Sequence, residues 1–154
     1  MDIKDPVVQT YVIAASAMCL KMSLQAWATV YQMIKAKGGY LHPEDIKKTG
    51  LNPAPSPEQL KPNPAVERSR AMQRNDTESI PIFLVAGFLF TLTHPPLLAA
   101  QVLMYAYVIS RLLHTYALGT GQVHDMRALF WSVGSLSTIA MSIHALVFAL
   151  KGNM

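Results

Sequence analysis

The sequence predicts an all-α protein, an integral membrane four-helix bundle formed by one domain over residues 1–154. Three observations lead to this prediction. Hydrophobic residues make up 51% of the chain and charged residues only 14%, which is unusual for a soluble domain of this length. Long apolar stretches occur four times, and such stretches are typical of helices that cross a bilayer. Clusters of glycine, proline and polar residues separate them, as expected for connections between helices.

The helices are expected at about residues 7–33, 64–93, 96–118 and 125–150. The first apolar run is too long for the apolar region of a signal peptide, so we interpret it as a retained helix. Lys21 interrupts this run far from both ends, and we expect it to pair with an acid on a neighbouring helix. Asn63 and Pro64 suit the cap and first position of the second helix. Gly119 suits the end of the third, and Asp125 suits the cap of the fourth.

Residues 34–63 form the only long polar segment, and we expect a loop there with one helical turn after His42. Five prolines exclude a continuous helix. The loop also carries five lysines, whereas the turn before the third helix has no lysine or arginine. Positively charged loops stay on the cytosolic side, so this loop and the third one are expected there, with both termini on the opposite side.

The second helix is unusual because only its second half is apolar. Residues 80–93 number 14, too few to cross a hydrocarbon core that needs about 20 helical residues. If this helix spans the bilayer, Arg74, Asn75 and Glu78 lie at or just inside its boundary. Glu67 and Arg70 extend the same stripe at helical spacing. Ionisable groups at this depth must face a bundle interior, which predicts either a binding site or an ion-pair lock between helices without a ligand.

Polar residues of the other helices are expected at the same depth. The third helix brings Arg111 and His114 to the cytosolic boundary, and the fourth begins there with Arg127 in its first turn. Cationic donors then exceed acids, which favours an anionic, hydrogen-bonding ligand from the cytosol. Apolar walls below this layer could admit a lipophilic reactant from the bilayer. The alternative is that these arginines only reach toward lipid phosphates.

Other chemistries find no support in the pattern. The chain has a net charge of +4, but no run combines basic residues with aromatics as nucleic-acid surfaces do. The five histidines show no metal-binding spacing, and Cys19 is the only cysteine. No nucleophile with an adjacent base is recognisable. If the protein is an enzyme, we expect its nucleophile to arrive with the ligand.

The run VERSRAMQRNDTESI resembles the glutathione-binding helix of the membrane-associated proteins in eicosanoid and glutathione metabolism, which include microsomal glutathione transferases and microsomal prostaglandin E synthase. Matching segments elsewhere are Lys21-Met22, His42-Pro43-Glu44-Asp45, Arg111-x-x-His114-Thr115 and Arg127-Ala128-Leu129. Together they span nearly the whole chain in the family's order. The resemblance implies a homotrimer of four-helix subunits, with glutathione bound at each subunit interface near the cytosolic side.

The resemblance also implies roles for individual residues. Arg127 would face the thiol and act as the catalytic residue. The glutathione-binding set would be Arg70, Arg74, Asn75, Glu78, Arg111, His114 and Tyr116.

Arg70 and Tyr116 are included because the chain departs from the family at two neighbouring positions. Ala71 stands where the family usually has arginine, and Arg70 is the available substitute. The family's tyrosine near the end of the third helix falls on Leu118, with Tyr116 close by.

The implied function is a membrane-bound glutathione transferase that activates the thiol as a thiolate for attack on lipophilic electrophiles from the bilayer, a detoxification reaction. A peroxidase reaction is open to the same thiolate. Two alternatives remain: an isomerase of the prostaglandin E synthase type, which Asp45 favours and Ala128 weakens, and a non-enzymatic lipid-binding or scaffold protein. The expected partners are glutathione, the electrophile, membrane lipid and other copies of the chain. The membrane would be the endoplasmic reticulum in a eukaryote or the inner membrane in a bacterium.

Overall fold

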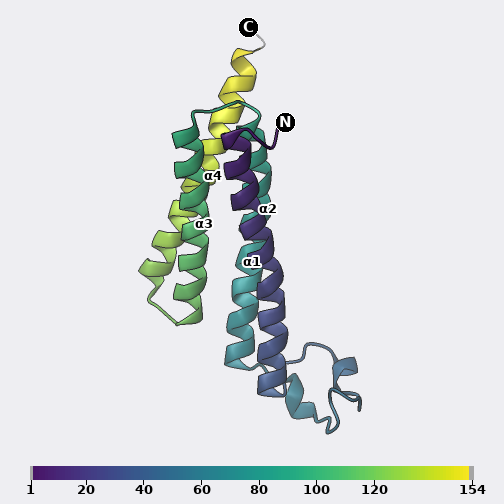
Figure 1. The fold of residues 1–154 in the computed structure, drawn as a ribbon. Helices are drawn as coiled ribbons and strands as arrows, with labels where there is room; N and C mark the ends of the chain where they lie inside the picture. The colour runs from purple at the N-terminus through teal and green to yellow at the C-terminus, as the bar shows by residue number, and fades with distance from the viewer. Residues whose placement is uncertain (1, 153–154) are drawn as a thin grey trace.

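The computed structural model describes residues 2–152, and within them the fold is entirely helical (Figure 1). The long helices are α1 (Pro6–Ala36), α2 (Pro64–Thr91), α3 (Leu97–Gly119) and α4 (His124–Lys151). Two short 3-10 turns, η1 (Pro43–Ile46) and η2 (Pro57–Leu60), lie in the loop between α1 and α2. The predicted all-α fold with four helices is therefore confirmed.

The helices form two hairpins that pack side by side. Contacts join α1 to α2, α3 to α4, α2 to both α3 and α4, and α1 to α3. Both termini lie at the end of the bundle opposite the long loop, and the α1–α2 hairpin reaches further toward the loop end than the α3–α4 hairpin (Figure 1). Within the described residues, α1, α3 and α4 are long and apolar enough to cross a membrane. α2 falls outside this group because its first half is polar.

The helix ends follow local sequence rules, with one correction. The side chain of Asn63 accepts hydrogen bonds from the backbone of the first turn of α2, as predicted. α3 ends at Gly119, also as predicted. The expected cap at Asp125 is wrong, because α4 begins one residue earlier, at His124, after Val123. Asp125 lies inside the first turn, where its negative charge interacts favourably with the positive end of the helix dipole.

The long loop contains more order than the sequence analysis predicted. The turn after His42 is present as η1, but η2 was missed. The sequence signal for η2 is a capping box, a serine followed three residues later by a glutamine. The Ser56 hydroxyl accepts a hydrogen bond from the backbone N–H of Glu58, and the Gln59 side-chain oxygen accepts one from the backbone N–H of Ser56. Gln59 also exchanges two amide hydrogen bonds with Asn52. The prolines therefore prevent a long helix without preventing local structure.

An apolar core joins α1, α2 and α3. Phe83 and Tyr107 stack face to face, with ring centroids 3.9 Å apart and planes 3° apart. Met18 of α1 and Met104 of α3 belong to the same buried cluster. Gly87 lets α1 approach α2, since an added Cβ there would lie 3.1 Å from the Tyr11 ring.

A buried ion pair connects α1 to α2 within this core. Lys21 Nζ lies 2.5 Å and 2.6 Å from the two carboxylate oxygens of Asp76, and the side chains are only 9% and 2% exposed. The predicted pairing of Lys21 with an acid of a neighbouring helix is confirmed. Because burial removes each charge from water, the two groups tolerate their position only together.

Removing one partner of this pair should therefore cost far more than removing both. We expect Asp76→Ala to destabilise the protein by about 3 to 5 kcal/mol, because Lys21 is left without its counter-charge. The double substitution of Lys21→Met with Asp76→Leu should recover most of that loss. Unfolding followed by circular dichroism in detergent measures both. Equal losses in the single and double variants would show that the pair is not what stabilises this contact.

Candidate functional site

Arg111 is the centre of the polar interior. It lies on α3, is 2% exposed, and donates to groups on two other helices. Nη1 lies 3.2 Å from Asn75 Oδ1 and 3.2 Å from Ser79 Oγ on α2. Nη2 donates to the backbone carbonyl of Trp131 on α4 at 3.1 Å. A guanidinium has rigid, forked donors, so these bonds fix three helices relative to one another.

Gly134 of α4 creates the space that Arg111 needs. A Cβ at this position would lie 2.6 Å from Ser110 Oγ and 3.0 Å from Arg111 Nε. Any side chain here would therefore push against the arginine that the site is built around. The absence of a side chain at Gly134 is what lets α3 and α4 approach closely at this level.

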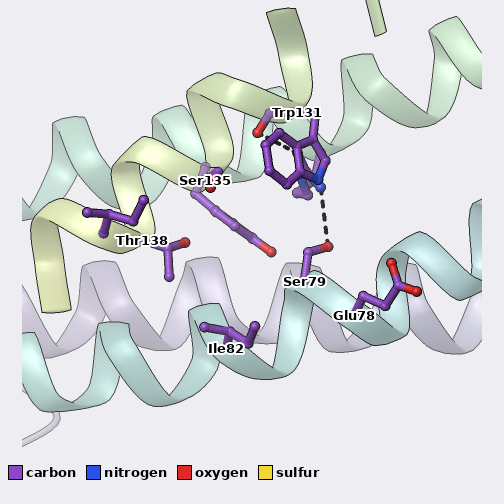
Figure 2. A pocket seen from close by; sticks show the side chains of 9 residues that line it. Glu78, Ser79, Ile82, Trp131, Ser135 and Thr138 are labelled. Carbon is purple, nitrogen blue, oxygen red and sulfur yellow. Dashed lines mark hydrogen bonds between the residues drawn. The ribbon is translucent and has the colours of Figure 1, made fainter. Parts of the chain in front are cut away.

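A cavity of about 280 Å³ opens beside Arg111, between α2, α3 and α4. In Figure 2, Ser79 and Ile82 of α2 face Trp131, Ser135 and Thr138 of α4 across it. The full lining is Glu78, Ser79, Ile82, Tyr107, Arg111, Trp131, Ser135, Thr138 and Ile139. Apolar walls with a few convergent polar groups are the usual composition of a small-molecule site.

A second hollow, of about 360 Å³, lies closer to the loop end of the bundle. Arg127 and Arg68 both line it, together with Ala71. Arg68 Nη1 contacts the backbone carbonyl of Leu118 at 3.4 Å. Arg127 Nε is buried and has no hydrogen-bond partner among residues 2–152. This hollow thus carries two cationic side chains with donor capacity to spare.

The two hollows occur on the same faces of α2 and α4. On α2 the lining residues Arg68 and Ala71 are followed by Glu78 and Ile82, with Asn75 between them at the same helical spacing. On α4, Arg127 and Trp131 are one turn apart and line one hollow each. The arginine-rich hollow and the more apolar cavity therefore follow one another along the space between α2 and α4.

Comparison with known proteins agrees with this architecture. A model of the MAPEG family, the family of membrane-associated proteins in eicosanoid and glutathione metabolism, matches residues 11–147. The chain belongs to the MAPEG family. It is 30% identical over 140 residues to microsomal glutathione S-transferase 1 of Rattus norvegicus, covering 91% of this chain and 89% of that protein. It is 24% identical over 141 residues to prostaglandin E synthase of Homo sapiens, covering 92% and 89% of the two chains.

In this MAPEG protein the structure brings together part of the predicted site. Asn75 and Arg111 are hydrogen-bonded, and Glu78 lines the same cavity as Arg111. His114 is buried one turn away on α3, within electrostatic range of both Arg111 and Arg127. Arg127 lines the neighbouring hollow. Residues from three helices thus lie near one level of the bundle.

Three predicted residues lie outside this group within the single chain. Arg70 points toward α1 and the long loop, where it pairs with Glu67 at 2.5 Å and donates to the Gly39 carbonyl at 2.6 Å. Arg74 is exposed, and Tyr116 is 65% exposed. Arg68, one turn before Ala71, lines the hollow beside it, whereas Arg70 has its donors engaged on another side of α2.

Of the residues that line the cavity, sequence reasoning identified only Glu78 and Arg111, and those it missed include Ser79, Tyr107 and Trp131. Each of these three lies four positions from a residue that was predicted. Ser79 follows Asn75, Tyr107 precedes Arg111, and Trp131 follows Arg127. Residues four apart share a helix face, so this spacing was the available signal.

The space at Gly134 gives a direct test of this arrangement. We expect Gly134→Ala to destabilise the protein by about 1 to 3 kcal/mol, because the new methyl group must displace Ser110 or Arg111. Gly119→Ala is the matched control, since its Cβ would meet only Met72 Sδ at an ordinary 3.6 Å. Thermal unfolding in detergent measures both variants. Similar stabilities for the two would contradict the close packing at Gly134.

Proposed function

We propose that this MAPEG protein is a membrane-bound glutathione transferase that activates the substrate thiol as a thiolate and directs it at lipophilic electrophiles. The observation that carries the proposal is the placement of the buried Arg111 and the half-buried Arg127 in two hollows that follow one another between α2 and α4. The likeness to microsomal glutathione S-transferase 1 supports it. Glutathione is an anion with several hydrogen-bonding groups, and it suits a site with cationic donors.

The arginine-rich hollow suits the charged end of such a substrate. Arg68 and Arg127 both line it, and Arg127 has an unpaired buried donor. Arg111 is less available, because Asn75, Ser79 and the α4 backbone already occupy its terminal nitrogens. We therefore assign Arg127 to the thiol and Arg111 to positioning Asn75 and α4. Arg74 and Glu78 remain candidates for contacts with the rest of the tripeptide.

The proposed chemistry needs only stabilisation of negative charge on sulfur. A free thiol has a pKa of about 8.5, and lowering it by about 2 units requires about 2.7 kcal/mol of preferential thiolate stabilisation. One desolvated arginine can provide an interaction of this size. The thiol proton leaves to solvent, and the thiolate attacks the electrophile. Because the thiol pKa is lowered on the enzyme, thiolate should form at a lower pH there than in solution.

Arg127→Ala tests this role. We expect turnover of a model aryl halide to fall to background while glutathione still binds, because the variant loses thiolate stabilisation and retains the other contacts. Ultraviolet absorbance of bound thiolate against pH should shift to higher pH in the variant. Lys151→Ala, which removes a cation from the other end of α4, is the control and should leave both measurements unchanged. Undiminished turnover in Arg127→Ala would remove this mechanism.

A glutathione-dependent isomerase is the second candidate, because a prostaglandin E synthase is among the relatives. The same thiolate could open an endoperoxide instead of displacing a leaving group. Product analysis with an aryl halide and with a prostaglandin endoperoxide separates the two activities. A non-enzymatic scaffold should show no saturable glutathione binding by calorimetry, and that result would remove both enzyme proposals.

We further propose that the chain works as a homotrimer with the long loop and the glutathione site on the cytosolic side. In an assembly, the exposed side chains of Arg74 and Tyr116 could meet a neighbouring subunit. Measuring the mass of the detergent-solubilised protein by light scattering, corrected for bound detergent, tests this. A monomeric mass together with full activity would exclude a site shared between subunits.

A further inference from the structure

We propose that the hydroxyl of Tyr107 donates a hydrogen bond to the carbonyl oxygen of a lipophilic α,β-unsaturated carbonyl compound bound in the cavity between α2, α3 and α4. This inference rests on the proposed transferase function and names a substrate class for it. It also gives a chemical role to a residue that neither the motifs nor the family resemblance identified.

The first observation is a buried donor with no acceptor. Tyr107 is 1% exposed and lines the cavity beside Arg111. Its hydroxyl lies beside that of Ser79 but makes no hydrogen bond of normal geometry in the part of the chain that the structure describes. Leaving a buried hydroxyl unpaired carries a desolvation penalty that a phenylalanine at this position would not have. A ligand with a hydrogen-bond acceptor would remove that penalty.

The neighbouring polar groups are already engaged. Ser79 lines the same cavity, but its hydroxyl donates to the Asn75 carbonyl at 2.6 Å and accepts from Arg111. Ser110 likewise donates to the backbone carbonyl of Tyr107 at 2.7 Å. Thr138, another hydroxyl of the lining, donates to the Gly134 carbonyl at 3.1 Å. Ser135 lines the cavity as well, but it is only half-buried, so Tyr107 is the fully buried hydroxyl at this level whose O–H remains available to a ligand.

The tyrosine ring is held in place before any ligand arrives. Phe83 stacks on it with a centroid separation of 3.9 Å, and the Arg111 guanidinium carbon lies 5.7 Å from its centroid. A donor fixed by packing requires little reorganisation when negative charge develops nearby. The cation of Arg111 adds a favourable potential for an oxyanion in the same cavity.

The remaining walls favour a lipophilic molecule with one polar group. Ile82, Trp131 and Ile139 supply apolar surface, and the volume of about 280 Å³ is near the lower end of the range for ligand sites. Tyr107 lies near the middle of α3, a helix long enough to cross a membrane. A substrate dissolved in the bilayer could therefore reach this depth, whereas a polar one would be excluded.

A conjugated carbonyl also fits the proposed reaction. The thiolate forms a carbon–sulfur bond at the β-carbon, and the alkene electron pair moves to place negative charge on the carbonyl oxygen. The Tyr107 hydroxyl stabilises that oxygen by hydrogen bonding. The α-carbon then takes a proton from water, and the proton released by the thiol neutralises the hydroxide. The net result is addition of the thiol across the carbon–carbon double bond, without any oxidant.

Tyr107→Phe tests the proposal, because it removes the hydroxyl and keeps the ring that stacks on Phe83. With 2-nonenal as the electrophile, kcat/KM should fall about 100-fold, the usual effect of losing one oxyanion donor. With benzyl chloride, whose displacement places no charge on a carbonyl oxygen, kcat/KM should stay within about twofold. Tyr105→Phe, on the same helix, should leave both reactions unchanged. Equal losses with both electrophiles, or undiminished addition to nonenal, would overturn the proposal.

A binding measurement separates this inference from the proposed function. In a Trp27→Phe background, Trp131 is the remaining tryptophan and reports on the cavity it lines. Its fluorescence should titrate with 2-nonanone, and Tyr107→Phe should weaken that binding about fivefold, corresponding to one hydrogen bond of about 1 kcal/mol. Binding of nonane should not change. Inactivity of the native protein toward both electrophiles would refute the transferase, while equal affinity of native protein and Tyr107→Phe for the ketone would refute the role of Tyr107.

Discussion

A guanidinium buried among three helices is the constraint on which the rest of the interior depends. Arg111 cannot lose its charge, so every donor it carries into the bundle needs an acceptor. Asn75, Ser79 and the carbonyl of Trp131 supply three of these acceptors from α2 and α4. Gly134 provides the room, because a larger residue would collide with the guanidinium. The spacing of α2, α3 and α4 at this level is therefore set by polar geometry as well as by apolar packing.

This constraint separates two kinds of environment along the same helix faces. Toward the loop end, Arg68 and Arg127 retain free donor capacity beside a hollow. One to two turns further in, Arg111 is saturated at its terminal nitrogens, and the cavity beside it is walled mostly by apolar side chains. A charged reactant and a lipophilic one would thus be held at neighbouring levels. Such an arrangement suits a reaction between a water-soluble thiol and a membrane-dissolved electrophile.

Much of the fold could be predicted from the sequence, because helix number and helix ends depend on local patterns. The apolar runs predicted the four helices, and Asn63 predicted the start of α2. Lys21 was also predictable, since a charge in the middle of an apolar helix requires a partner. Asp125 failed as a cap because an acid is favourable anywhere in the first helical turn, so its presence locates that turn only to within a few residues.

The site was harder to predict, because helical spacing gives the face of a residue but not its partner. Helical spacing places Arg70 and Arg74 on the same face of α2. In the structure, however, Arg70 donates a hydrogen bond to the Gly39 carbonyl in the loop. That contact depends on the loop's path, which local patterns do not specify. Tyr107 was overlooked because an aromatic residue in an apolar run suggests core packing alone. Only the packed structure reveals that its hydroxyl is left without an acceptor.

The pairing of Lys21 with Asp76 has a consequence for how the protein is made. Each charge alone would cost about 2.5 to 3.5 kcal/mol at the centre of a translocating helix. α2 is also less apolar than the other three helices, so it has the weakest tendency to partition into lipid by itself. Neutralising Asp76 with the lysine of the preceding segment lowers that barrier. It follows that α1 should wait beside the translocon until α2 emerges from the ribosome, and that the two should pass into the lipid as one unit.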